Sequence, residues 1–404
     1  MSVFEEPLRR FDLARLTSPR SVGVLGIFLG AFAFWLTLPP LTSRTILWPV
    51  LVGILAVAAG IWAASRDERR VGWGAIVAGV LGIALGLLAT RSGETNLDSV
   101  VVWSALIAAM LRYATPLTFA AIGGMFSERS GVVNIGLEGM MLMGTFFGIW
   151  GAVRFHHWWM GLLVAAVAGG ALALVHAFFA IHLRADQIVS GTAINFLALG
   201  ITGYLFIDIY GSNGTPNLTG AESIPDITIW KSNNFFANAF GQLNLMIWLS
   251  FLLILLSYLV MFRTPVGLRI RSVGEHPRAA DTVGISVYGT RYAAVTLSGM
   301  LAALGGAYLS VGFVHSFNQN MTAGRGYIAL AALIFGKWRP FGAFGAALLF
   351  GFSTALAQRL GQNYGDIYGT LFNTLPYALT LIAVAGVIGR SIPPAAVGRP
   401  YKKQ

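Results

Sequence analysis

The sequence predicts an all-α protein, a polytopic membrane helix bundle of about 12 helices that includes broken or re-entrant segments. The 404 residues are 56% hydrophobic and only 11% charged, with a mean hydropathy of +0.71, whereas soluble domains hold roughly 25% charged residues. Apolar runs recur along the whole chain, and Lys and Arg residues stand mostly between them. We therefore expect most of the molecular surface to face lipid.

A membrane-spanning helix needs about 20 mainly apolar residues. The first candidate ends in Pro39 and Pro40 rather than in a small-residue cleavage site, so we expect it to be retained. One candidate, from Gly324 to Gly336, is too short to span comfortably. The candidates are Ser21 to Leu38, Ile46 to Ala64, Val71 to Thr90, Val100 to Phe126, Val132 to Trp150, Trp159 to Leu183, Gln187 to Tyr210, Leu243 to Phe262, Tyr292 to Gly312, Gly324 to Gly336, Phe341 to Gln358 and Ile367 to Gly389.

The charges between the spans predict an orientation. If every candidate crosses and the N-terminus is cytoplasmic, the inside segments hold 20 of the 27 Lys and Arg residues and the outside segments hold 6. An excess of cations marks the cytoplasmic loops of membrane proteins. We therefore expect both termini in the cytoplasm, and we interpret the net charge of +11 as a topology signal rather than as a nucleic-acid surface.

Several chemistries find no support in the sequence. The chain has no cysteine, so it forms neither a disulfide nor a thiolate metal site, and its six histidines show no metal-ligand spacing. Gly336 and Lys337 resemble a phosphate loop only superficially, because Ala331 replaces the first glycine and Trp338 the Ser or Thr. We expect no enzyme activity and no cofactor or metal bound by this chain, so any ATP would be used by another subunit.

Two apolar stretches are interrupted by glycines and polar residues. The first runs from Ser127 to Gly139 and the second from Thr322 to Lys337, about 193 residues further on. Such runs favour broken helices, whose freed backbone groups must be buried in protein or face water. Paired interruptions in corresponding halves of a membrane protein are a sequence pointer to a transport pathway.

Polar side chains within the predicted spans need partners or water. Glu138 would line a pathway, cap broken-helix amides or pair with Arg112, and we favour a structural role. His176 is interpreted as a packing histidine. Thr192 and Asn195 share a small and polar helix face that would either line a path for an uncharged solute or hold helices together.

Two longer connections differ in character. Gly211 to Gln242 is rich in turn-forming residues and suits an external loop. The basic connection from Arg263 to Arg291 contains a predicted short helix from Gly274 to Gly284, with Pro277 near its start. Its pattern fits either a solvated connector or a small apolar face that enters the groove of a partner.

Four stretches together resemble the permeases of the nucleoside and simple-sugar branch of bacterial ATP-binding-cassette (ABC) importers, within the wider superfamily of branched-chain-amino-acid-type permeases. The likeness covers about Val100 to Gly389. The stretches are Ala114 to Leu117 with Gly123 to Met141, Gly267 to Ile285, Leu297 to Gly306, and Gly324 to Ala332 with Gly336 to Pro340.

This resemblance implies an importer of nucleosides or related simple sugars. It implies a second related permease in a heterodimer, cytoplasmic ATP-binding subunits that hold ATP and Mg, and an extracellular substrate-binding lipoprotein or periplasmic protein. It places the chain in a bacterial inner or plasma membrane. The Met140-Met141 motif looks like that of the shorter of two paired permeases, although the first hundred residues depart from it.

Carried onto this chain, the resemblance gives three regions: an N-terminal extension with about three spans (1–98), an ABC permease core (99–390) and a cytoplasmic tail (391–404). It also assigns two sets of residues. The coupling helix that docks on the ATPase would comprise Gly274, Glu275, His276, Pro277, Arg278, Ala279, Ala280 and Asp281. The substrate pathway would include Asn134, Glu138, Thr192, Asn195 and Asn318.

Two alternatives remain open from the residues. Broken segments also occur in ion-coupled secondary carriers, which would move a polar uncharged solute without ATP. A membrane scaffold or receptor subunit is the third interpretation.

Overall fold

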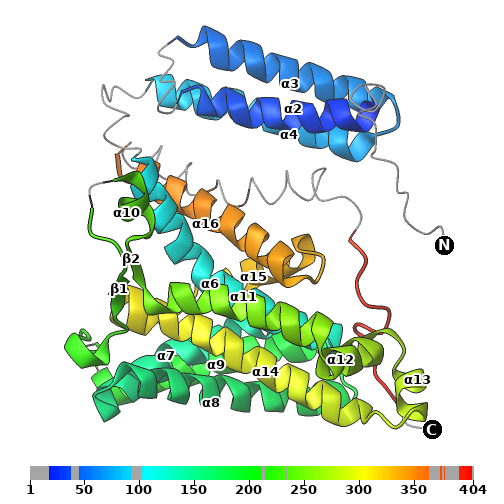
Figure 1. Ribbon diagram of the computed structural model, residues 1–404, viewed down its shortest axis with the longest axis vertical. Coiled ribbons are helices and arrows are strands. Elements are labelled where there is room, and N and C mark those ends of the chain that lie inside the picture. The colour runs from blue at the N-terminus through cyan, green and yellow to red at the C-terminus, as the bar shows by residue number, and fades with distance from the viewer. Residues whose placement is uncertain are drawn as a thin grey trace, which may run out of the picture. The chain divides into compact units, whose positions relative to one another are not determined.

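A computed structural model describes residues 18–37, 45–91, 102–211, 214–232, 234–363, 374, 377 and 391–402. It confirms the all-α fold (Figure 1). Eight of the described helical segments are long and apolar enough to cross a membrane. These are α3 (Leu47–Ser65), α4 (Arg69–Arg91), α6 (Trp103–Arg129), α8 (Trp158–Ala177) with the π-helix η1 (Phe178–His182), α9 (Gln187–Tyr210), α11 (Leu245–Arg263), α14 (Val287–Ala307) with the π-helix η4 (Tyr308–Val314), and α16 (Pro340–Asn363).

The predicted spans correspond closely to helices. The helix α9 has the predicted bounds, and two shorter apolar helices, α2 (Pro19–Trp35) and α15 (Arg325–Phe335), occupy two other candidates. The helix α7 (Leu137–Phe155) begins five residues later than the predicted Val132, because residues 130–136 form the break itself. The last candidate, Ile367 to Gly389, lies outside the described residues.

The chain forms two compact units. One comprises residues 1–102 and 356–390, and its described helices α2, α3 and α4 pack against one another in all three pairings. Small residues allow this close packing. A Cβ atom on Gly82 would lie 2.1 Å from the carbonyl oxygen of Gly30, so α2 and α4 touch through their backbones.

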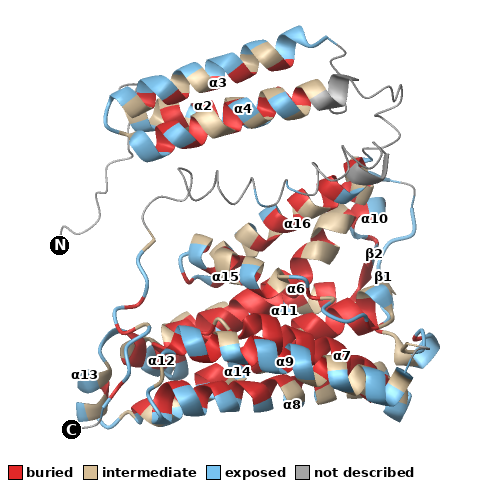
Figure 2. Cartoon of the chain, turned by 180° about the vertical axis from the view of Figure 1, so that it is seen from behind, coloured by how far each residue is buried: buried red, intermediate tan, exposed pale blue. Residues whose placement is uncertain are grey.

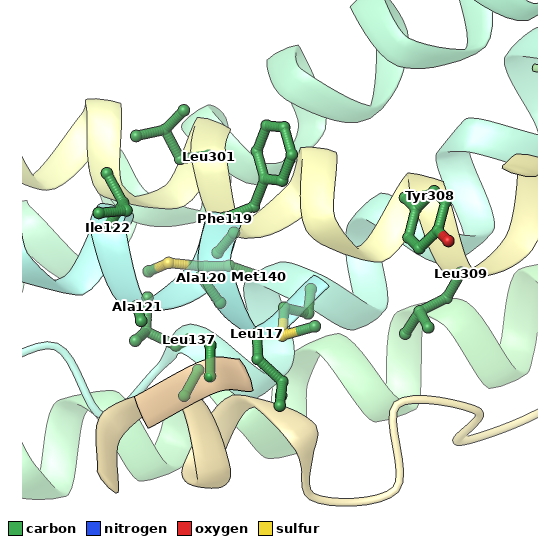
Figure 3. Close-up of a cluster of buried hydrophobic side chains, with 14 of the residues drawn as sticks. Leu117, Phe119, Ala120, Ala121, Ile122, Leu137, Met140, Leu301, Tyr308 and Leu309 are labelled. Atoms are coloured by element: carbon green, nitrogen blue, oxygen red, sulfur yellow. The ribbon is translucent and has the colours of Figure 1, made fainter. Parts of the chain in front are cut away.

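The second unit comprises residues 103–355 and 391–404 and contains the candidate site. Its helix α14 packs against α6, α7 and α8. Most residues of α6 and of the first part of α7 are buried (Figure 2). The side chains between these helices form one apolar cluster, in which Leu117, Ile122, Met140 and Leu301 are among the residues drawn in Figure 3.

The connection between α9 and α11 carries small elements of its own. These are η3 (Gly220–Glu222), the strands β1 (Asp226–Thr228) and β2 (Gln242–Asn244), and the helix α10 (Phe235–Phe240). The strands pair antiparallel with Asp226 opposite Asn244. Asn244 also caps α11, because its side-chain oxygen accepts the N–H of Met246 at 3.1 Å.

The basic connection after α11 is mostly helical. Helix α12 (Pro265–Glu275) is followed by α13 (Pro277–Thr282), and both have proline in the first turn. The predicted helix over Gly274 to Gly284 is therefore shorter than expected, since Gly274 and Glu275 end α12. Proline lacks the N–H that would continue α12, so a new helix begins at Pro277. Gly284, with φ of 82°, ends the segment as predicted.

Candidate functional site

The first interrupted stretch is a break between two helices. Helix α6 ends at Arg129 and α7 begins at Leu137. Gly131 has φ of 94°, a left-handed conformation that glycine adopts without steric cost. The hydroxyl of Ser127 donates to the carbonyl oxygen of Val132 at 2.8 Å, which satisfies one acceptor that the break releases. Other polar groups of the break bond to side chains of distant helices, such as the N–H of Val133 to Gln187 and the amide of Asn134 to Ser298.

Asn195 of α9 joins the break to α15. Its Oδ1 accepts the backbone N–H of Gly139 at 2.7 Å, and its Nδ2 donates to the carbonyl oxygen of Ile135 and to the hydroxyl of Tyr327, both at 3.0 Å. An amide side chain suits this position because it both donates and accepts. Asn195 is buried, on the packed face of α9.

Glu138 caps α15 from the first turn of α7. Its Oε1 accepts the backbone N–H of Gly324 at 2.8 Å, and its Oε2 accepts that of Gly326 at 2.6 Å. The first N–H groups of a helix have no partner within the helix, and a helix N-terminus favours a negative charge. Of the roles considered from the sequence, capping is therefore the one for which the structure supplies partners.

Asn134 lies in the break and is fully buried. Its Nδ2 donates to the hydroxyl of Ser298 on α14 at 3.0 Å and lies 3.4 Å from the sulfur of Met140. Its Oδ1 has no hydrogen-bond partner among the described residues. A buried acceptor of this kind is a place where a water or a solute hydroxyl would bind.

The other two predicted pathway residues do not bond to this cluster. The hydroxyl of Thr192 donates within its own helix to the carbonyl oxygen of Ile188, at 2.9 Å. Asn318 is exposed in the connection before α15, where its carbonyl oxygen accepts the N–H of Met321 at 3.2 Å. The structure thus gathers Asn134, Glu138 and Asn195 around the break and leaves Thr192 and Asn318 at its margins.

A second attachment, not predicted from the sequence, holds the other end of α15. The indole Nε1 of Trp338 donates to Oε2 of Glu128 at 2.5 Å. Nε and Nη2 of Arg129 donate to the carbonyl oxygen of Trp338, at 3.1 and 2.9 Å. Trp338 and Lys337 both have positive φ, a strained turn that persists because these contacts fix it. The sequence signal for this attachment was the pair Glu128 and Arg129 at the end of α6, because charged side chains at the end of an apolar span need partners.

Two polar residues of the spans have other environments. His176 is fully buried, and its ring nitrogens lie 3.0 Å from the hydroxyl of Ser190 and 3.0 Å from the carbonyl oxygen of Val133, which fits the interpretation as a packing histidine. Arg112 lines a cavity of about 790 Å³. The other lining residues come from the connection between α9 and α11: Thr228, Trp230, Lys231, Ser232, Ala237, Asn238 and Gln242.

The predicted coupling segment presents an exposed surface. Ala279 is exposed, and Val283 just beyond α13 is 74% exposed, whereas Ala280 is buried against the protein. The exposed pair is four residues apart, as predicted. Apolar residues that are exposed on a short helix and just after its end suit contact with a partner.

The chemistry of these groups is that of hydrogen bonding to neutral partners. Around Asn134 and Asn195, the polar groups are amides, hydroxyls and the carboxylate of Glu138, which accepts two backbone N–H groups. Within the part of the chain that the structure describes, no group of three or more His, Asp or Glu residues could hold a metal ion.

The chain matches the family model described as branched-chain amino acid transport system, permease component, over residues 106–384. It is 44% identical over 321 residues to the guanosine ABC transporter permease protein NupQ of Bacillus subtilis, an alignment that covers 76% of this chain and 99% of NupQ. It is 40% identical over 308 residues to the nucleoside ABC transporter permease protein NupC of Lactococcus lactis, covering 74% of this chain and 96% of NupC.

A second Bacillus subtilis protein, the guanosine ABC transporter permease protein NupP, is more distant. It is 23% identical over 292 residues, which cover 68% of this chain and 82% of NupP. No solved structure matches the chain.

Proposed function

The chain belongs to the family of branched-chain amino acid transport system permease components, and from this membership we propose that it moves nucleosides. It is a multi-pass membrane protein and a permease subunit of an ABC importer. The proposal that the solute is a nucleoside rests on the 44% identity to a guanosine permease across nearly the full length of that protein. Related simple sugars are the second class of solute that we propose to test in uptake assays.

The proposed partners are argued from the same comparison. Two guanosine ABC transporter permease proteins of Bacillus subtilis, NupQ and NupP, match this chain, and NupQ is the more similar of the two. We propose that the chain pairs with a second, NupP-like permease. Cytoplasmic ATPase subunits would hold ATP and Mg, and an extracellular lipoprotein would deliver the solute. The chain itself then acts as a transporter subunit rather than as an enzyme.

The solute pathway is proposed to include Asn134, Glu138, Thr192, Asn195 and Asn318. Asn134 supports this best, because its Oδ1 is buried and lacks a partner among the described residues. Thr192 and Asn318 would contact solute nearer the surface. Glu138 and Asn195 would act mainly by holding α7, α9 and α15 in place.

The coupling helix is proposed to be α13. Its exposed Ala279 and the neighbouring Val283 would enter a groove of the ATPase, and movement of the ATPase would move the cytoplasmic ends of the helices. Both termini are proposed to be cytoplasmic, in the inner or plasma membrane of a bacterium. The hydrogen bond between the N–H of Ala396 and the carbonyl oxygen of Gly274 supports a shared side for the C-terminal segment and the coupling segment.

Reconstitution in proteoliposomes tests the proposal. The chain, its paired permease, the ATPase and the lipoprotein are assembled, and guanosine uptake is measured with ATP, without ATP, and with an ion gradient alone. ATP-dependent uptake is expected. Uptake that persists without ATP and collapses with the gradient would establish an ion-coupled carrier, and absence of uptake under all conditions would favour a scaffold.

A further inference from the structure

The C-terminal segment, Ser391 to Lys402, lies along the coupling segment. In Figure 1 it is the red trace that runs beside α12 and α13. The backbone N–H of Ala396 donates to the carbonyl oxygen of Gly274 at 2.9 Å, and that of Ala395 donates to Oε2 of Glu275 at 3.1 Å. These bonds fix the segment at the junction between α12 and α13.

Tyr401 attaches the same segment to α13 itself. Its phenol donates to Oδ2 of Asp281 at 2.8 Å, and its ring is buried in an apolar cluster with Val273, Ala280 and Val287. Burial and the bond to Asp281 both raise the pKa of the Tyr401 phenol, so it keeps its proton at neutral pH and remains a donor. A hydrogen bond to a carboxylate is stronger than one between neutral groups.

Arg291 connects the segment to the break between α6 and α7. Its guanidinium Nη1 donates to the carbonyl oxygen of Arg399 at 3.2 Å, and its Nε donates to the carbonyl oxygen of Ser130 at 3.2 Å. Arg291 is 1% exposed, at the cytoplasmic end that we propose for α14. A continuous set of contacts therefore leads from α13 through Tyr401, Arg399 and Arg291 to the residues that precede Asn134.

This attachment matters because α13 is a single short helix. It has six residues, its N-cap makes no side-chain hydrogen bond, and Ala280 is its one buried residue. Isolated helices of this length are unstable in water. A helix can pass on a movement to the rest of the protein only if the two are firmly attached. The C-terminal segment supplies such contacts to α13, on the side away from the exposed Ala279.

We propose that Tyr401 is a positioning residue, through which the C-terminal segment makes α13 move together with the break between α6 and α7. The inference rests on the proposed role of α13 as the coupling helix. Without the Tyr401 to Asp281 bond, α13 would shift under the ATPase while the break stayed in place. ATP would then be hydrolysed with less solute moved.

The test uses the complete importer in proteoliposomes, with guanosine as the solute. Tyr401→Phe removes the hydroxyl and keeps the ring, and Asp281→Asn keeps an acceptor oxygen. The matched control is Tyr204→Phe, because Tyr204 is 69% exposed on α9, far along the chain from α13. Initial rates of uptake and of ATP hydrolysis are measured on the same vesicles.

We expect Tyr401→Phe to raise the ATP hydrolysed per guanosine imported by roughly threefold or more, since one charge-assisted hydrogen bond is lost. Tyr204→Phe should keep the wild-type ratio, and Asp281→Asn, which keeps a neutral and weaker hydrogen bond, should give a ratio between those of the wild type and Tyr401→Phe. Amide exchange at residues 278–284 of the assembled complex should become about tenfold faster in Tyr401→Phe, while α14 keeps its protection.

A wild-type ratio and wild-type exchange in Tyr401→Phe would overturn the inference. If that variant does not assemble, Asp281→Ala removes the same bond from the other side. We expect it likewise to raise the ATP hydrolysed per guanosine imported and to speed amide exchange in α13. A wild-type complex that shows no ATP-dependent uptake would instead contradict the proposed function, so the two failures are distinguishable.

Discussion

The carboxylate of Glu138 accepts the backbone N–H of Gly326 at 2.6 Å, across 188 residues of sequence. It also accepts the N–H of Gly324. The start of α15 is thus held by the first turn of α7, and its far end by Glu128 and Arg129 of α6 through Trp338. The two interrupted stretches of the sequence form one structure, in which the first holds the second at both ends.

Glu138→Ala should lower the stability of the protein against unfolding more than Glu138→Gln does. Alanine leaves the N–H groups of Gly324 and Gly326 without acceptors, at a cost of about 1–3 kcal/mol each in unfolding free energy, whereas glutamine keeps one acceptor oxygen. Thermal unfolding of the purified permease pair in detergent measures the order. Equal stability of Glu138→Ala and wild type would contradict the capping role.

Gly326→Ala should be strongly destabilising because of its contact with α7. An added Cβ would lie 2.5 Å from the backbone nitrogen and Cα of Glu138, so α15 must move away from α7. Gly345→Ala is the control, since a Cβ there meets nothing within 4 Å and alanine favours a helix over glycine by about 1 kcal/mol. Melting temperatures of the two variants should therefore move in opposite directions.

The pair of Glu128 and Trp338 should behave as one unit in a double-mutant cycle. Trp338→Phe leaves the buried carboxyl group of Glu128 without its indole donor, and the loss of such a hydrogen bond costs about 1.5–3 kcal/mol in unfolding free energy. Glu128→Gln in the Trp338→Phe background should recover part of this loss, because the unpaired charge is gone. Strictly additive effects on unfolding would show that the two side chains do not interact.

Ala279→Arg should abolish ATP-dependent uptake while the permease still folds. Ala279 is exposed, so arginine costs little within this chain, but it would not fit an apolar groove on the ATPase. Ala279→Ser serves as the control of similar size. Copurification of the ATPase and uptake by vesicles are the two measurements, and unchanged uptake in Ala279→Arg would refute the docking of α13.

Thr192→Val and Asn195→Ala should separate solute contact from structure. Among the described residues, the hydroxyl of Thr192 bonds to Ile188 of its own helix, so valine should keep the stability of the protein and raise KM for guanosine. Asn195→Ala releases three hydrogen bonds and should lower the melting temperature as well as uptake. A wild-type KM in Thr192→Val would remove Thr192 from the proposed pathway.

The helices and their interruptions follow from local sequence. Helix α9 begins and ends where the apolar run does, and the start of α13 follows from Pro277 because proline favours the first helical turn. The position of Glu138 in a broken segment was also evident. Its partners were not, because a carboxylate in a span would be satisfied equally well by Arg112, by water or by helix amides.

The contacts of Glu128 and Tyr401 could not be predicted from the sequence either, because their partners lie far away along the chain. Glu128 meets Trp338 across 210 residues, and Tyr401 meets Asp281 across 120. Hydropathy and helical periodicity describe which face of a segment is apolar, and they do not state which segment covers it. The C-terminal segment, interpreted only as a tail, has no periodic pattern at all.

The sequence by itself determined that this is a lipid-embedded helical protein with two interrupted stretches, because the transfer of each apolar run into a bilayer depends on that run alone. The tertiary structure decided which groups meet at the interruptions: Glu138 with the start of α15, Trp338 with the end of α6, and the C-terminal segment with α13. A polar group that is buried among helices needs a hydrogen-bond partner, and the packing of the helices determines which group that partner is.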